Sequence, residues 1–215
     1  MKPLPIPGYQ QFADYAQAQG WSLSDEQQQR IVDLAQWLAE RAPRLGLSKY
    51  ADLPSVLSYA MAPALAISDL IEPGEIKRVV DLGAGSGALG LTLGIIQPGW
   101  EVTLMDRSSK TATFLEWTVQ WLGMENVTVR HEDAARLATG GAARYDLVCL
   151  RAVASARQAL QLAGPLAGPG GSVVAWHQAE DEGFRSPQSA LSYMATTPTV
   201  VPGLVASLYR PQVTS

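Results

Sequence analysis

The sequence predicts an α/β fold in which a doubly wound, mostly parallel sheet of seven strands follows an N-terminal helical cap. Three observations predict it. The first 75 residues show helical periodicity, short apolar runs alternate with helical segments from residue 78 onward, and an apolar run leads directly into a glycine-rich turn. We therefore expect a helical cap over residues 1–75 and an α/β domain over residues 76–215.

Composition excludes several classes of protein. With 215 residues, 47% of them hydrophobic and 17% charged, the chain is expected to fold, and its net charge of −4 gives no overall attraction to a polyanion. No run approaches the roughly 20 apolar residues of a membrane span, and prolines interrupt the first seven residues, so we expect a cytoplasmic protein with no membrane partner. The one cysteine, Cys149, and two histidines argue against a disulfide or a metal site.

The cap is expected to contain three helices. The first covers residues 9–19. Ser24 and Gln27 have the spacing of a capping box for the second helix, which buries residues at helical spacing, namely Ile31, Leu34, Ala35 and Leu38. The third covers residues 53–70, and Pro63 is expected to kink or divide it.

The α/β domain is expected to alternate five strands with four crossovers. The strands are residues 78–82, 101–106, 127–131, 145–150 and 172–176, and the helical segments are residues 88–96, 109–122, 134–137 and 155–166. Two further β-rich runs within residues 196–210 flank Pro202 and Gly203. This turn pair predicts an antiparallel C-terminal hairpin that completes the seven strands.

The glycine-rich turn carries the chemistry. Gly83, Gly85 and Gly87 separate the first strand from the next helix, and they leave the backbone without side chains where a ligand has to approach closely. The second strand ends at Asp106, 106 − 83 = 23 residues after the first glycine. Rossmann-like nucleotide-binding folds place an acid that binds ribose hydroxyls at about this spacing.

Two alternatives exist for this turn. In the first, the glycines only make a tight turn and Asp106 caps the following helix. In the second, the ligand is NAD, since Gly83, Gly85 and Ala88 also fit a loose dinucleotide-binding pattern. Asp81 separates the ligands, because its carboxylate repels a pyrophosphate and attracts a cation. S-adenosylmethionine has no phosphate and carries an ammonium and a sulfonium.

The residues around this turn resemble the class I S-adenosylmethionine-dependent methyltransferases. Within that class the chain resembles the 16S ribosomal RNA methyltransferase G family, also called glucose-inhibited division protein B. The matching segments are residues 81–87 with Gly90, residues 104–110 leading to Phe114 and Leu115, and Arg151-Ala152-Val153-Ala154-Ser155. They lie within residues 79–177, and the family also begins with a helical cap.

The resemblance implies roles for individual residues. Gly83 and Ala88 line the cofactor pocket, Asp106 holds the ribose, and Asp133 with the turn after it frames the adenine. Arg151 lies near the transferred methyl group and the acceptor, and His177 stands where the family has a substrate-facing lysine. The candidate cofactor-binding residues are Asp81, Gly83, Gly85, Gly87, Ala88, Asp106, Asp133, Ala134, Ala135 and Arg151, and the candidate substrate-binding residues are Arg151 and His177.

The resemblance further implies methylation of N7 of a guanine in 16S ribosomal RNA, with the RNA or the 30S subunit as partner. N7 has a free lone pair and no proton to lose, so no catalytic base is expected. The chain has Gly46-Leu47-Ser48 where the family typically has Asn-Leu-Thr. A methyltransferase of the same fold acting on another RNA or on a small molecule therefore remains an alternative.

RNA contacts are expected from local features only. The basic candidates are Lys2, Arg30, Arg41, Arg44, Lys49, Arg107 and Lys110. Trp176 is expected at the rim of the pocket, where an aromatic ring stacks on a base. Trp117 and Trp121, four residues apart, are expected in the core, and Cys149 is expected to be a buried strand residue rather than a nucleophile.

Overall fold

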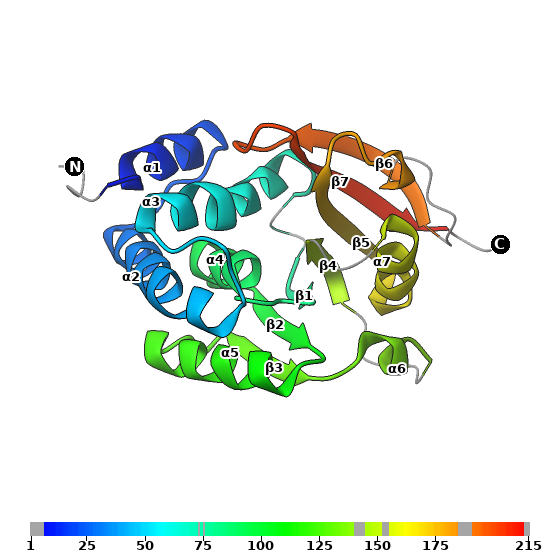
Figure 1. Cartoon of the computed structure of the whole chain (residues 1–215). Helices are drawn as coiled ribbons and strands as arrows, with labels where there is room; N and C mark the ends of the chain where they lie inside the picture. The colour runs from blue at the N-terminus through cyan, green and yellow to red at the C-terminus, as the bar shows by residue number, and fades with distance from the viewer. Residues whose placement is uncertain are drawn as a thin grey trace.

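A computed structural model of the chain describes residues 7–72, 74, 76–139, 145–151, 155–184 and 191–212. Seven strands form one sheet in the order β3-β2-β1-β4-β5-β7-β6 (Figure 1). The first five strands in this order, β3-β2-β1-β4-β5, are parallel, and β7 pairs antiparallel with both β5 and β6. The strands are β1 (Arg78–Leu82), β2 (Glu101–Asp106), β3 (Val127–His131), β4 (Tyr145–Arg151), β5 (Ala167–Gln178), β6 (Leu191–Pro198) and β7 (Leu204–Pro211). The predicted fold class, including the C-terminal hairpin, is confirmed.

Helices cover both faces of the sheet (Figure 1). The α-helices are α1 (Tyr9–Ala18), α2 (Asp25–Arg41), α3 (Leu53–Ser55), α4 (Ala88–Ile96), α5 (Ser109–Leu122), α6 (Ala134–Thr139) and α7 (Ala156–Ala163). The 3₁₀ helices are η1 (Pro43–Leu45), η3 (Ala62–Asp69), η5 (Gly164–Leu166) and η6 (Glu182–Phe184), and η2 (Val56–Met61) is a π-helix. No helix among the described residues is long and apolar enough to cross a membrane.

The inner strands β1, β2 and β4 are buried on both faces, as in a doubly wound sheet. In β1, Val79 belongs to the hydrophobic cluster that contains α2, α4 and α5, whereas the next residue, Val80, belongs to the cluster that contains α7. Successive side chains of a strand point to opposite faces, so one apolar run supplies both clusters.

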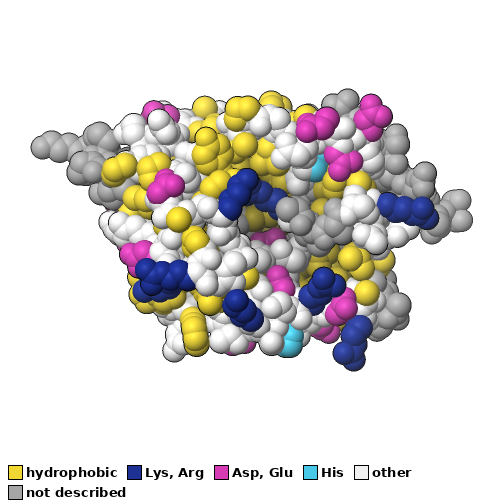
Figure 2. Space-filling view, in the orientation of Figure 1, with side chains coloured by type: hydrophobic (Ala, Val, Ile, Leu, Met, Phe, Trp, Pro, Cys, Tyr) yellow, Lys and Arg dark blue, Asp and Glu magenta, His cyan; other side chains and the backbone are white. Residues whose placement is uncertain are grey.

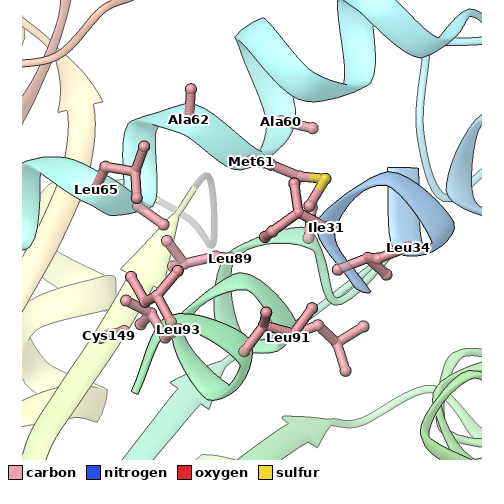
Figure 3. Close-up of a cluster of buried hydrophobic side chains, with 14 of the residues drawn as sticks. Ile31, Leu34, Ala60, Met61, Ala62, Leu65, Leu89, Leu91, Leu93 and Cys149 are labelled. Atoms are coloured by element: carbon pink, nitrogen blue, oxygen red, sulfur yellow. The ribbon is translucent and has the colours of Figure 1, made fainter. Parts of the chain in front are cut away.

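The N-terminal helices pack on the same face as α4. Ser24 and Gln27 form the predicted capping box at the start of α2, and the Gln27 amide also donates to the carbonyls of Ile95 and Ile96 at the end of α4. Figure 3 shows side chains of α2, η2, η3, α4 and β4 meeting in one cluster, among them Ile31, Leu34, Met61, Leu65, Leu89, Leu91 and Cys149. The cap and the sheet therefore share one core, and a domain boundary after residue 75 stays a prediction.

Pro63 divides the third helical segment, as predicted. The segment begins as α3, continues as η2, which has the wider turns of a π-helix, and ends as η3, a 3₁₀ helix with Pro63 in its first turn. Proline has no backbone N–H and clashes with the preceding turn of an α-helix, so it is accommodated where a new helical stretch begins.

Three tryptophans differ from expectation. Trp117 and Trp121 were expected in the core, but their exposed fractions are 60% and 50%, because α5 buries Phe114, Leu115 and Thr118 instead. Trp121 stacks on Trp37 of α2 with 4.5 Å between the ring centroids. Trp176, expected at a pocket rim, is 1% exposed, and its Nε1 donates to the Pro63 carbonyl at 2.8 Å. It is therefore a core residue.

Candidate functional site

Two cavities lie at the carboxyl ends of β1, β2 and β4, and Gly83 lines both of them. The larger cavity, about 610 Å³, extends toward α6 and α7, and the smaller, about 340 Å³, extends toward the N-terminal cap. Figure 2 shows acidic side chains in a hollow near the middle of one face, with Lys and Arg side chains around it. The carboxyl edge of a parallel sheet is where doubly wound folds bind their ligands.

The three glycines of the turn have different structural tasks. All have positive φ, which is 72° at Gly83, 55° at Gly85 and 78° at Gly87. A Cβ on Gly85 would meet only the Gly83 carbonyl, at 3.9 Å, so this glycine leaves open space in the wall of the smaller cavity. A Cβ on Gly87 would lie 2.7 Å from Leu91 and from Leu115. Gly87 therefore serves the packing of α4 and lies outside the residues that line the two cavities.

Asp106 joins the glycine turn to α5. One carboxylate oxygen accepts from the Gly85 N–H at 3.1 Å, and the other accepts from the Ser108 N–H at 2.9 Å. Ser108, whose hydroxyl accepts from the Thr111 N–H, is the residue that caps α5. Asp106 also lines the larger cavity, and each of its oxygens keeps lone-pair capacity for a hydroxyl donor.

Asp81 is a buried carboxyl group in the wall of the smaller cavity. Burial raises its pKa to about 7, against the opposing effects of the hydrogen bond from the Gly90 N–H, 2.8 Å long, and of the Arg151 charge. A Cβ on Gly90 would lie 2.8 Å from the Asp81 Cβ, so a glycine there allows this close approach. A cation in the smaller cavity would favour the ionised carboxylate.

Arg151 forms another part of the smaller cavity at the end of β4. Its guanidinium donates to the carbonyl of Ala60 at 2.8 Å and to the carbonyl of Tyr59, both in η2. Burial lowers the Arg151 pKa from its ordinary value. The next three residues of the family motif, residues 152–154, lie outside the described residues, as does Lys2.

The turn before α6 lies on the larger cavity. The Asp133 carboxylate accepts from the Ala135 N–H at 2.9 Å, and Asp133, Ala134 and Ala135 all line the cavity. Gln158 and Gln161 of α7 also line this cavity, and no sequence motif indicates them as site residues. The apolar side of α7 predicts that these glutamines face away from the core, but the sequence does not indicate which cavity they face.

His177, like Gly87, is a predicted site residue that lies outside the linings of the two cavities. It is buried near the end of β5, where Nε2 is 2.8 Å from the Ser207 hydroxyl and Nδ1 is 2.8 Å from the Gln178 carbonyl. Its ring stacks on Phe184. The remaining candidates line one or both cavities, and they are Asp81, Gly83, Gly85, Ala88, Asp106, Asp133, Ala134, Ala135 and Arg151.

Within the described part of the chain, no group of three or more acidic, histidine or cysteine residues is arranged to hold a metal ion.

Comparison with known proteins decides the family. The model of the family described as rRNA small subunit methyltransferase G matches residues 27–211. The chain belongs to this family. It is therefore a methyltransferase, and the match begins within α2 and includes all seven strands.

Curated relatives and solved structures agree with this assignment. A ribosomal RNA small subunit methyltransferase G of Burkholderia vietnamiensis is 30% identical over 172 residues, which are 78% of this chain and 75% of the relative. The protein of the same name from Staphylococcus saprophyticus is 30% identical over 164 residues, 76% of this chain and 69% of the relative. An O-methyltransferase family protein from Burkholderia thailandensis has a TM-score of 0.57 at 16% identity, covering 81% of this chain and 64% of that structure. This likeness concerns the fold alone.

Proposed function

We propose that the protein transfers a methyl group from S-adenosylmethionine to N7 of a guanine in 16S ribosomal RNA. The observation that carries the cofactor is the pair of cavities that meet at Gly83, one lined by Asp106 and the other by Asp81. This arrangement suits a ligand with hydroxyls toward one end and a positive charge toward the other. The names of the family and of its relatives support ribosomal RNA as the acceptor.

The residues present fit the cofactor. Asp106 would accept hydrogen bonds from the ribose hydroxyls, and Asp133 with the backbone of Ala134 and Ala135 would frame the adenine in the larger cavity. Gly83, Gly85 and Ala88 would leave room for the methionine part, and Asp81 would face its charge. The same carboxylate disfavours NAD, because a pyrophosphate in this place would meet a negative charge.

The proposed reaction needs no proton transfer by a side chain. When bound, S-adenosylmethionine supplies an electrophilic methyl group: the N7 lone pair forms the new N–C bond, the C–S electron pair stays on sulfur, and the positive charge moves to the purine. Since N7 carries no proton, no general base is required. The chain's contribution is to orient the acceptor and to exclude water, and orientation alone supplies several kcal/mol, roughly 7–11 in well-oriented model reactions.

We also propose that residues 1–75 act as a cap over the α/β domain, residues 76–215. Leu47, Ser48, Lys49 and Tyr50 come from this segment and line the smaller cavity opposite the glycine turn. The cap would therefore form the acceptor side of the site. The packing of the cap helices against α4, which begins directly after the glycine turn, supports this arrangement.

The test is transfer of labelled methyl from S-adenosylmethionine to 30S subunits that lack the modification. Label is expected in 16S RNA, and nuclease digestion followed by mass spectrometry is expected to identify it as 7-methylguanosine. Binding of S-adenosylhomocysteine to the same preparation, measured by calorimetry, is the control for an intact site. Full binding without label in 16S RNA would reject the acceptor, and label in a different nucleoside would reject N7 of guanine.

A further inference from the structure

An aromatic and cationic wall stands beside the smaller cavity. The rings of Tyr50 and Tyr59 stack with 5.6 Å between their centroids and 18° between their planes. The Lys49 ammonium lies 5.3 Å from the centroid of the Tyr50 ring. Lys49 and Tyr50 line the cavity, and Tyr59, which stacks on Tyr50, is 43% exposed. An exposed aromatic ring next to a cavity offers a surface on which a base can stack.

This wall is attached directly to the site. Tyr59 lies in η2, the stretch with π-type turns, and such stretches occur frequently at functional sites. The carbonyls of Tyr59 and Ala60 accept from Arg151, which itself lines the smaller cavity. On the other side of the stack, the Tyr50 N–H donates to the Ser48 hydroxyl at 3.0 Å. Both tyrosines are therefore positioned relative to the cavity by backbone contacts.

The wall also provides positive charge for a nucleic acid. Lys49 makes no ion pair with any residue that the structure describes. A cation beside a stack that ends in an exposed ring can contact a phosphate while that ring stacks on the neighbouring base. A small apolar acceptor would use the rings but not the ammonium, so the combination favours a nucleotide.

We propose that Tyr59 and Tyr50 form the stacking platform for the acceptor guanine and that Lys49 contacts an adjoining phosphate. The proposal rests on the proposed function and adds the residues that hold the acceptor. Methylation at N7 leaves a positive charge on the purine, and an aromatic face attracts a cationic ring more strongly than a neutral one. The platform would therefore hold the transition state more tightly than the unreacted base, which accelerates transfer as well as binding.

The first test compares Tyr59→Leu, which removes the ring, with Tyr59→Phe, which keeps it. On unmodified 30S subunits, Tyr59→Leu is expected to lower kcat/KM about tenfold, with part of the loss in kcat, since one base stacked on an aromatic ring contributes on this scale. Tyr59→Phe is expected to remain close to the wild type. The matched control is Tyr193→Phe on β6, a tyrosine of similar exposure, 37%, far along the sheet order from β1. Unchanged S-adenosylhomocysteine affinity and unchanged melting temperature would show that each variant is folded.

The second test needs no turnover. Calorimetric titration of the protein saturated with S-adenosylhomocysteine is expected to give tighter binding of 7-methylguanosine monophosphate than of guanosine monophosphate. Tyr59→Leu is expected to remove most of that preference, and Lys49→Ala is expected to weaken both ligands equally. If Tyr59 had only a structural role, Tyr59→Leu would change neither the preference for 7-methylguanosine monophosphate nor the kcat.

The outcomes separate this proposal from the proposed function. Wild-type kcat/KM in Tyr59→Leu, or equal affinity of the wild type for the two mononucleotides, would overturn the platform while transfer to RNA stands. A wild type that binds the cofactor but labels no RNA would overturn the proposed function, and the mononucleotide titration would then decide on the platform by itself.

Discussion

The two oxygens of the Asp106 carboxylate accept hydrogen bonds from the backbone and would also accept them from the proposed ligand. Hydrogen bonds from the Gly85 and Ser108 N–H groups fix its rotamer, so little side-chain entropy remains to be lost when a ribose binds. Its position at the end of β2 follows from the sequence alone. Its two backbone partners do not, because they depend on how the turn after β1 approaches β2.

Asp106→Ala is expected to weaken S-adenosylmethionine binding by about 1–3 kcal/mol, because the hydrogen bonds to the ribose hydroxyls are lost. Isothermal titration calorimetry measures this difference. The control is Glu116→Ala, which removes an exposed carboxylate from α5 and should leave the dissociation constant unchanged. An Asp106→Ala variant with wild-type affinity would refute the ribose contact.

Asp81 predicts a pH dependence of stability. Its pKa is about 7 in the folded chain and 3.8 in a model compound, so the unfolded chain ionises first as the pH rises. The free energy of unfolding contributed by Asp81 is therefore expected to fall between about pH 4 and pH 7, by on the order of 4 kcal/mol in total. Asp81→Asn should lack this component while its amide oxygen still accepts from the Gly90 N–H. Urea unfolding of both proteins across this range measures it, and parallel pH profiles would contradict the account.

At the scale of elements, the close packing of β1, β2 and α4 depends on Gly90. An added Cβ would lie 2.5 Å from the Leu104 side chain and 2.8 Å from Asp81. Gly90→Ala is therefore expected to lower the free energy of unfolding by about 1–3 kcal/mol through overpacking. Gly99→Ala, where a Cβ meets nothing within 4 Å, is the matched control. Equal chemical denaturation midpoints for the two variants would show that the helix can shift without cost.

The elements themselves were largely predictable, because each has a local signature. The Ser24 and Gln27 capping box, the division at Pro63 and the turn at Pro202 and Gly203 depend only on neighbouring residues. β5 is longer than the apolar run that predicted it, since Ala167 pairs with Tyr145 and the strand continues through a glycine-rich stretch. The glycines of this stretch lie between the Ala167–Tyr145 and Ser172–Leu147 pairs, where the register shifts, and such an irregularity in a strand is a common place for glycine.

The tryptophans show the limit of local reasoning. The spacing of Trp117 and Trp121 correctly places them on one face of α5, but only the arrangement of α2 and the sheet determines that this face is outside. Trp176 is similar: its indole donates to the carbonyl of Pro63, 113 residues away in the chain. Contacts of this range are not encoded in any local pattern.

At the scale of the whole molecule, the cap and the sheet share buried surface. Leu89, Leu91 and Leu93 of α4 lie in the same hydrophobic cluster as Ile31 and Leu34 of α2. A shared core couples the unfolding of both parts. For the same reason, the site was only half predictable: the sheet side followed from motifs, whereas the wall at Tyr50 and Tyr59 required the fold.

Unfolding is therefore expected as a single cooperative transition. Tryptophan fluorescence reports on both parts, because Trp21 and Trp37 lie in the cap and the other four tryptophans lie after residue 75, and it should show one transition with the same melting temperature as far-ultraviolet circular dichroism. A fragment of residues 76–215 should expose the apolar face of α4 and fail to fold alone. Two separate transitions, or a stably folded fragment, would show that the cap is an independent domain.

The central claim is that the two cavities joined at Gly83 form one site for S-adenosylmethionine. Its most direct test is a crystal structure of the protein with S-adenosylhomocysteine. We expect the ribose hydroxyls on the Asp106 carboxylate, the adenine between the turn at Asp133 and α7, and the amino acid part beside Asp81. A complex in which the ligand binds elsewhere, or in which chain side groups fill both cavities, would contradict it.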